Sequence, residues 1–298
     1  MNRSPATALG GIAYVVLAGA CFAILDTVTQ YVILTVPVLM ALWVRYLLQA
    51  VISTAVLLPL HGRRLFHTRH PKLQMLRGLL LTTSTTLAFF GLRVMSVGEF
   101  TAIVMVTPLA VTVLAVTVLK EKIAPLHWLF IVGGFAGAMI IIRPGGQRFG
   151  WSALIPLACM VASSVFQLVS SHLGKTEKPA TTHFYTGWVG ASLSTLLLPL
   201  TWVMVDSPRL WLLLLFMGTM GALGHFVLAL AYQRAPASRL MPYLYCQLGF
   251  AVLAGWLAFS HVPDKLACLG IGLIAVNGVC GAWLTAREHR LPTELPES

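Results

Sequence analysis

Two ionisable residues, Asp26 and Arg45, lie inside long apolar stretches of this sequence. An Asp or Arg side chain at the centre of a membrane helix costs about 2.5–3.5 kcal/mol, so such residues are kept for a partner or a function. Because an arginine side chain can extend several ångströms along its helix, we expect the two groups to be able to meet. Either they form a structural pair, or Arg45 holds a ligand carboxylate while Asp26 holds an amine or a proton. No second acid lies as deep, so Asp26 is the candidate for proton coupling.

Polar and aromatic residues recur at helical spacing in the second half of the chain. Ser163 and Gln167 are four residues apart and share one helix face, as do His225 and Tyr232, which are seven apart. Such stripes suit the wall of a cavity for a flat or amphipathic ligand. The alternative is structural, because Trp and Tyr gather at membrane interfaces and hydroxyl groups bridge helices. The candidate ligand-binding residues are Asp26, Arg45, Ser163, Gln167, Tyr185, Trp188, His225, Tyr232, Tyr245 and Gln247.

A proline inside an apolar stretch removes a backbone hydrogen bond and kinks the helix. Pro108 is such a residue, and its kink is read either as a hinge or as a static bend. Glu99 and Glu121 fall at predicted helix ends, where a solvated ion pair and a gate between two states are both open interpretations. The candidates for coupling or gating are therefore Asp26, Glu99 and Pro108.

The elements that must position these residues are membrane helices. Of the 298 residues, 58% are hydrophobic and only 10% are charged, whereas a soluble domain carries about 25% charged residues. A membrane helix needs about 20 mostly apolar residues. The sequence predicts an all-α membrane protein with ten such helices, at 9–30, 36–60, 77–95, 100–119, 124–142, 151–171, 183–203, 210–232, 239–259 and 267–285.

Basic residues lie in the short gaps between these stretches and give a net charge of +11. They do not form one patch with aromatic neighbours, so nucleic-acid binding is excluded as an interpretation. With a cytoplasmic N-terminus, fourteen Lys and Arg fall on the inside and five on the outside, with Arg77 counted in the inside loop. We therefore expect a multi-pass inner-membrane protein with both termini in the cytoplasm.

The two halves of the chain resemble each other. Residues 9–30 match 149–170 at an offset of 140, and Gly133 matches Gly272 at 139. The predicted units are 9–145 and 149–286, with a cytoplasmic tail at 287–298. Because five helices is an odd number, the second unit enters the membrane from the opposite side. Inverted repeats of this kind are typical of secondary transporters, whose ligand site lies near the midplane between the halves.

Small residues predict a close helix contact in the second half of the chain. Gly187, Gly190 and Ser194 share a face of the seventh predicted helix. Small residues let helix backbones approach each other in a membrane. We therefore expect this face to pack tightly against a neighbouring helix.

The first half also carries a family pattern, in residues 91–103, Thr107-Pro108, Glu121, the Gly133/Gly137 pair and Arg143-Pro144-Gly145. It resembles the EamA-type module of the drug/metabolite transporter superfamily. The second half departs from the pattern, with Cys246-Gln247 and Ser260-His261 at the corresponding positions. The resemblance implies a ten-helix inner-membrane transporter of small organic metabolites that does not hydrolyse ATP. It favours export of an amino acid or derivative, with uptake of a vitamin- or nucleoside-like metabolite as the alternative.

An intramembrane enzyme is the less favoured alternative. It would need paired acids, a metal-binding His pair or a nucleophile with a nearby base, and one deep acid with scattered His does not provide these. His61, His67 and His70 share a basic loop without fellow ligands, and the five Cys lack CxxC spacing, so we expect neither a metal nor a cofactor. The expected partners are a small-molecule substrate and the lipid bilayer, and a homodimer is left open.

Overall fold

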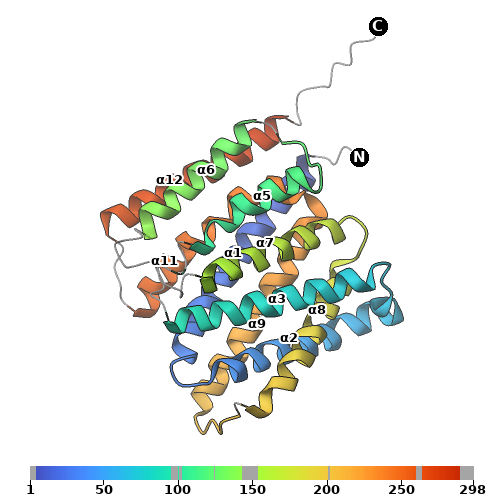
Figure 1. Cartoon of the computed structure of the whole chain (residues 1–298). Coiled ribbons are helices and arrows are strands. Elements are labelled where there is room, and N and C mark those ends of the chain that lie inside the picture. The colour runs from blue at the N-terminus through green and yellow to red at the C-terminus, as the bar shows by residue number, and fades with distance from the viewer. Residues whose placement is uncertain are drawn as a thin grey trace.

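The computed structural model describes residues 5–94, 100, 103–123, 125–142, 154–200, 202–259 and 264–288. Every regular element in this part of the chain is a helix (Figure 1). The α-helices are α1 (Pro5–Val32), α2 (Val38–His61), α3 (Pro71–Val94), α5 (Thr107–Thr117), α6 (Pro125–Ile142), α7 (Leu154–Leu173), α8 (Pro179–Leu197), α9 (Pro208–Arg234), α10 (Ala237–Leu244), α11 (Cys246–Phe259) and α12 (Lys265–Glu288). Short 3₁₀ turns, Gly62–Phe66 and Leu198–Leu200, follow α2 and α8.

Prolines mark where several helices begin. Pro71, Pro125, Pro179 and Pro208 are each the first residue of a helix. A proline there loses nothing, because the first backbone N–H groups of a helix have no partner within it and the proline φ angle already suits the helix. The sequence thus sets these boundaries locally, and the apolar residues that follow extend each helix.

Five of the described helices are long and apolar enough to cross a membrane: 9–32, 38–66, 71–94, 154–173 and 208–234. Three shorter apolar helices lie within 107–117, 125–141 and 265–281. Each of the ten predicted stretches contains a helix, which confirms the prediction of an all-helical fold. The chain is therefore a multi-pass membrane protein.

The fourth and ninth predicted stretches are not continuous helices. A turn at Met105–Val106 precedes α5, and α10 and α11 meet at Tyr245. Pro108 was expected to kink a helix from within. The structure instead places it in the first turn of α5, where it removes no helical hydrogen bond. The interruption lies just before it, at the turn.

Helices from the two halves of the chain interleave (Figure 1). α1 packs on α9 and α11, α3 on α7 and α8, and α2 on α8 and α9. α5 packs on α7 and α10, while α6 and α12 run side by side at one edge of the bundle. The largest buried clusters lie between α1, α9 and α10 and between α1, α2 and α9. Residues far apart in sequence can therefore line one common space.

The predicted small-residue face of α8 packs closely against α2. A Cβ atom at Gly187 would lie 3.0 Å from the backbone nitrogen of Ala50, and one at Gly190 would meet the ring of Tyr46. Ser194 is buried on the same face. This contact fixes the depth and rotation of α2, the helix that carries Arg45.

Candidate functional site

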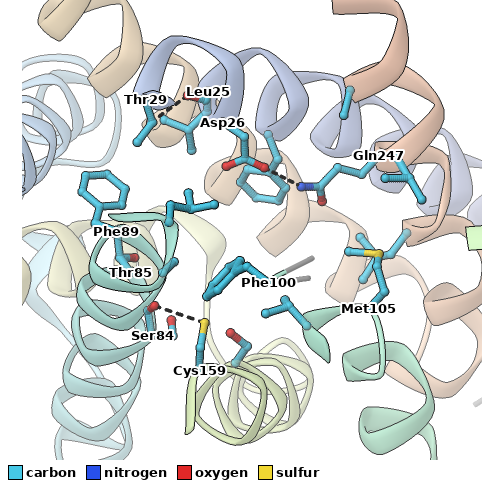
Figure 2. Close-up of a pocket in the computed structure, with 18 of the residues that line it drawn as sticks. Leu25, Asp26, Thr29, Ser84, Thr85, Phe89, Phe100, Met105, Cys159 and Gln247 are labelled. Carbon is cyan, nitrogen blue, oxygen red and sulfur yellow. Dashed lines mark hydrogen bonds between the residues drawn. The ribbon is translucent and has the colours of Figure 1, made fainter. Parts of the chain in front are cut away.

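One cavity of about 520 Å³ lies where helices of both halves converge. Its wall is built by α1, α2 and α3 of the first half, by α7, α9 and α11 of the second, and by residues of the interrupted fourth stretch. Figure 2 shows these side chains turned toward a common space. Six of the ten predicted ligand-binding residues line it: Asp26, Arg45, Ser163, Gln167, His225 and Gln247.

Asp26 is the one acidic residue among the described residues that line the cavity. Its Oδ2 accepts a hydrogen bond of 3.0 Å from Nε2 of Gln247, which joins α1 to α11 (Figure 2). No described residue donates a hydrogen bond to Oδ1. The carboxylate thus links the two halves of the chain and keeps an acceptor for a ligand.

Arg45 connects a different pair of helices, α2 and α9, whereas Asp26 connects α1 and α11. Its Nη2 donates a 3.1 Å hydrogen bond to Nε2 of His225, which joins α2 to α9, and its guanidinium lies 5.6 Å from the ring centre of Tyr46. Of the two alternatives for Asp26 and Arg45, the structural pair is not formed, since no ion pair joins them among the described residues. The competing partners explain this, because His225 holds one group and Gln247 the other. Both charges line the same cavity without neutralising each other directly.

Phenylalanine rings supply the apolar part of the wall. Phe22, Phe89, Phe100 and Phe166 line the cavity from four different stretches of the chain. The imidazole of His225 lies 4.8 Å from the ring centre of Phe22 and 5.8 Å from that of Phe166. Aromatic faces of this kind favour stacking or edge contacts with a flat ring system. The sequence analysis did not single out these residues, because Phe is common in any membrane helix.

The sequence analysis also missed Arg77, which it counted in a basic loop. Because α3 begins at Pro71, Arg77 lies nearly two turns inside it and is only 2% exposed. It donates hydrogen bonds to the Ser170 hydroxyl at 2.7 Å and the Thr182 carbonyl at 3.0 Å, and its guanidinium lies 4.8 Å from the ring centre of Phe166. Arg77 therefore ties α3 to α7 and α8 and supports a ring of the cavity wall. The proline that starts α3 was the signal that could have revealed it.

Four of the predicted ligand-binding residues lie outside the described cavity lining. Tyr185 donates to the carbonyl of Phe66 at 2.9 Å, and Trp188, which is 42% exposed, donates to the Thr54 hydroxyl at 3.0 Å. Both lie on the face of α8 that meets α2 and the turn after it. Tyr232 is buried and donates to Oε1 of Gln167 at 3.0 Å, so it supports a lining residue.

Tyr245, the fourth of these residues, connects the two helix interruptions. It is fully buried, and its hydroxyl donates to the backbone carbonyl of Met105 at 3.3 Å. The interruption in the second half is thus bonded to the one in the first, and Met105 and Gln247 beside them line the cavity. Glu99, one of the candidates for coupling or gating, lies outside the described residues.

The opposite end of the bundle is held by two glutamates, Glu177, which is buried, and Glu121, which is partly buried. Glu121, beyond the end of α5, accepts hydrogen bonds from Ser238 at the start of α10 (2.7 Å from the hydroxyl) and pairs with Lys175 at 3.6 Å. Glu177 accepts from the Thr68 hydroxyl at 2.9 Å and the Arg69 backbone at 2.6 Å. We call Glu121, Lys175, Ser238, Glu177, Thr68 and Arg69 the connector cluster.

The cavity and the connector cluster occupy opposite ends of the same helical stretches. Phe100 and Val104 line the cavity before α5, whereas Glu121 follows α5. Along the ninth stretch Ser238 lies at the start and Val252, a lining residue, near the end. The connector cluster therefore closes the protein at the end away from the cavity.

Replacing Glu121 by alanine is expected to loosen this closed end. The change removes both Ser238 hydrogen bonds and the Lys175 pair, and each hydrogen bond to a charged group contributes about 1.5–3 kcal/mol. We expect backbone amides of 237–244 to exchange with deuterium about tenfold faster, measured by mass spectrometry. The neighbouring solvent-exposed Lys122→Ala is the control and should leave exchange unchanged. Equal exchange in both variants would show that the cluster does not hold this end.

The known proteins that this chain resembles are membrane transporters. A sequence profile of the EamA-like transporter family matches residues 9–143. A riboflavin transporter of Vibrio cholerae is 29% identical over 286 residues, 95% of this chain and 96% of that protein. A riboflavin transporter of Rhizobium johnstonii is 30% identical over 279 residues, 91% of this chain and 90% of that protein. An S-adenosylmethionine uptake transporter of Rickettsia prowazekii is 27% identical and covers 92% of each chain.

The fold also occurs among solved structures. One crystal structure superposes with a TM-score of 0.78 and 20% sequence identity, and the match covers 96% of this chain and 99% of the other. At this identity the likeness concerns the fold alone. The profile match in the first half agrees with the sequence pattern, which is strongest between residues 90 and 145.

Proposed function

Because this chain belongs to the EamA-like transporter family, within the drug/metabolite transporter superfamily, we propose that it takes up a small heteroaromatic metabolite, with riboflavin as the first candidate. Its relatives support a membrane transporter of small molecules, not an enzyme. The sequence-based preference for export of an amino acid receives no support from the three relatives compared above. We therefore place the alternative, uptake of a vitamin-like compound, ahead of it.

The cavity is the observation that carries this proposal. It has about 520 Å³ of space between phenylalanine rings, with amides and hydroxyls among them. Ligand pockets are typically apolar clefts of about 300–1,000 Å³ with a few placed polar groups. A planar ring system would lie among Phe22, Phe89, Phe100 and Phe166, and its polar edge would meet Asp26, Arg45, Ser163, Gln167, His225 and Gln247.

Two inverted repeats, 9–145 and 149–286, remain part of the proposal. Under the sequence offset, α1 corresponds to α7, α2 to α8, α3 to α9, α5 to α11, and α6 to α12. Contacts between helices follow this correspondence, since a contact in one half recurs between the equivalent helices. The contact of α1 with α9 recurs as that of α7 with α3. The contact of α2 with α9 recurs as that of α8 with α3, and that of α1 with α11 as that of α7 with α5. α2–α8 and α6–α12 pair equivalent helices. Both interrupted helices also occupy equivalent places, as expected for a carrier with a central site.

We propose that the ligand site is exposed alternately on the two sides. With both termini in the cytoplasm, the connector cluster joins four segments expected on the cytoplasmic side: 61–76, 120–122, 175–178 and 234–239. Hydrogen bonds and an ion pair link them in the structure. The cavity then faces the outside while the connector cluster closes the inside. Transport requires this cluster to open, with Asp26 as the proposed coupling residue.

Uptake by purified protein in liposomes tests the proposal. Vesicles that contain the chain should accumulate radiolabelled riboflavin at least tenfold faster than empty vesicles, because the lipid barrier is otherwise rate-limiting. The label should be recovered as unchanged riboflavin, since an enzyme would convert it to a product. Uptake no faster than in empty vesicles would exclude riboflavin as the substrate.

A second candidate is S-adenosylmethionine, favoured by one specific observation. The free Oδ1 of Asp26 faces the cavity and suits a cationic group, which S-adenosylmethionine carries and riboflavin does not. The same liposomes should be offered this compound in parallel. Faster accumulation of S-adenosylmethionine than of riboflavin would make it the preferred substrate.

A further inference from the structure

The pair of Arg45 and His225 carries unused hydrogen-bond donors. An arginine side chain can only donate, so Nε2 of His225 accepts and the neutral ring carries its proton on Nδ1. That Nδ1 is buried and has no partner among the described residues. The Nε of Arg45 is likewise buried without a partner. Each of these two adjacent side chains on the cavity wall therefore keeps one buried N–H group without an acceptor among the described residues.

The positive charges of Arg45 and Arg77 are also not balanced by a carboxylate bonded to either of them among the described residues. Arg45 is 4% exposed and Arg77 2%, and neither pairs with a carboxylate among the described residues. The ring of Phe166 is next to both Arg77, whose guanidinium lies 4.8 Å from its centre, and His225, whose ring centre lies 5.8 Å away. The carboxylate of the same cavity, Asp26, is bonded to Gln247 on another pair of helices. A buried cation without a partner is costly, and a bound anion would remove that cost.

Space beside the pair lets a ligand reach it. Arg45 and His225 both line the cavity. The close approach of α9 is permitted by Gly221, where a Cβ atom would lie 2.9 Å from Nε of Arg45. The guanidinium thus lies close to the backbone of α9, with its Nε nearest to Gly221.

From this geometry we propose that the Arg45–His225 pair forms an oxyanion subsite of the cavity, for a carboxylate or a phosphate on a ligand whose ring system lies among the phenylalanines. Riboflavin carries neither group and would leave this subsite unfilled, whereas the carboxylate of S-adenosylmethionine would fill it. The inference rests on the proposed function, because it takes the cavity as the ligand site. Charge-assisted hydrogen bonds to an arginine are about twice as strong as neutral ones. The carrier should therefore prefer the anionic member of a matched pair of aromatic compounds.

Binding of two matched pairs to the purified full-length chain tests the inference. Flavin mononucleotide and riboflavin differ by a phosphate, and indole-3-acetate and indole-3-acetamide differ by a carboxylate charge. Isothermal titration calorimetry should give at least tenfold tighter binding of the anionic member in one pair, which identifies the oxyanion. Arg45→Gln should weaken that member at least tenfold and its neutral counterpart less than threefold. Arg45→Lys retains the charge and should retain a preference for the anion.

Several outcomes would overturn the inference. These are equal binding within both pairs by the wild-type chain, absence of binding by all four compounds, or an anion preference that survives Arg45→Gln. If Arg45→Gln does not fold, the inference is still tested by the binding of the matched pairs to the wild-type chain and by the anion preference of Arg45→Lys. The proposed function fails separately: a preference for indole-3-acetate without riboflavin uptake would support the oxyanion site and exclude riboflavin as cargo.

Discussion

Replacing Asp26 by alanine is expected to slow uptake by about 50-fold while the protein stays folded. The carboxylate is the single acidic group on the described cavity wall, and its hydrogen bond from Gln247 joins the two halves. A lost hydrogen bond to a charged group costs about 1.5–3 kcal/mol, and about 1.4 kcal/mol corresponds to tenfold in rate. Initial rates of riboflavin uptake into liposomes, together with the melting temperature of the purified variant, measure the effect.

Three companion variants separate the roles of this carboxylate. Gln247→Ala removes the bridge but leaves the charge, so a smaller loss of about fivefold is expected. Asp264→Asn is the control, because it replaces an aspartate by asparagine at the start of α12, outside the cavity. It should leave uptake within twofold of wild type. Asp26→Asn removes the charge at constant shape, and uptake should lose its pH dependence. Full activity of Asp26→Ala would exclude a role in transport, and an unchanged pH profile of Asp26→Asn would exclude coupling.

The sequence identified Asp26 and Arg45 because a charge inside an apolar stretch is costly wherever the helices pack. This argument needs no knowledge of neighbours, and the structure places both residues on one cavity. Their partners could not be derived in the same way. Gln247 and His225 hold them because α1 packs on α11 and α2 on α9. These contacts between the halves are set by the whole bundle.

Helical spacing showed which residues share a face but not what that face meets. Ser163 and Gln167 line the cavity, whereas Tyr185 and Trp188, chosen by the same reasoning, meet α2 and the turn after it. Arg77 shows the converse case. Counting basic residues in loops hid a buried arginine, although the proline at position 71 marks the start of its helix.

Interrupted helices were only partly foreseen. Pro108 drew attention to the fourth stretch, because proline disturbs a helix. The turn nevertheless lies at Met105–Val106, and the ninth stretch turns at Tyr245, three residues after Pro242, a proline that the sequence analysis did not single out. The bond between Tyr245 and Met105 joins these two places. A contact between segments 140 residues apart is available only from the folded chain.

Replacing Gly187 by leucine is expected to reduce the yield of folded protein at least tenfold. Even a Cβ atom there would lie 3.0 Å from the nitrogen and 3.1 Å from the Cα of Ala50, both in the backbone of α2. A helix backbone cannot turn aside as a flexible side chain does, so the two helices must separate. Overpacking of this kind costs about 1–3 kcal/mol or more. The monodisperse fraction in size-exclusion chromatography measures the loss.

Gly272→Leu is the matched control, because a Cβ atom there has no neighbouring atom within 4 Å. The same residue change in another long helix should leave the yield unchanged. The smaller substitution Gly187→Ala connects packing to the site, since α2 carries Arg45 and must shift by a few tenths of an ångström to admit the methyl group. We expect this variant to fold and to bind its ligand about threefold more weakly. Wild-type affinity in Gly187→Ala would show that α2 can yield without moving Arg45, and the cavity would then tolerate more helix motion than its packing implies.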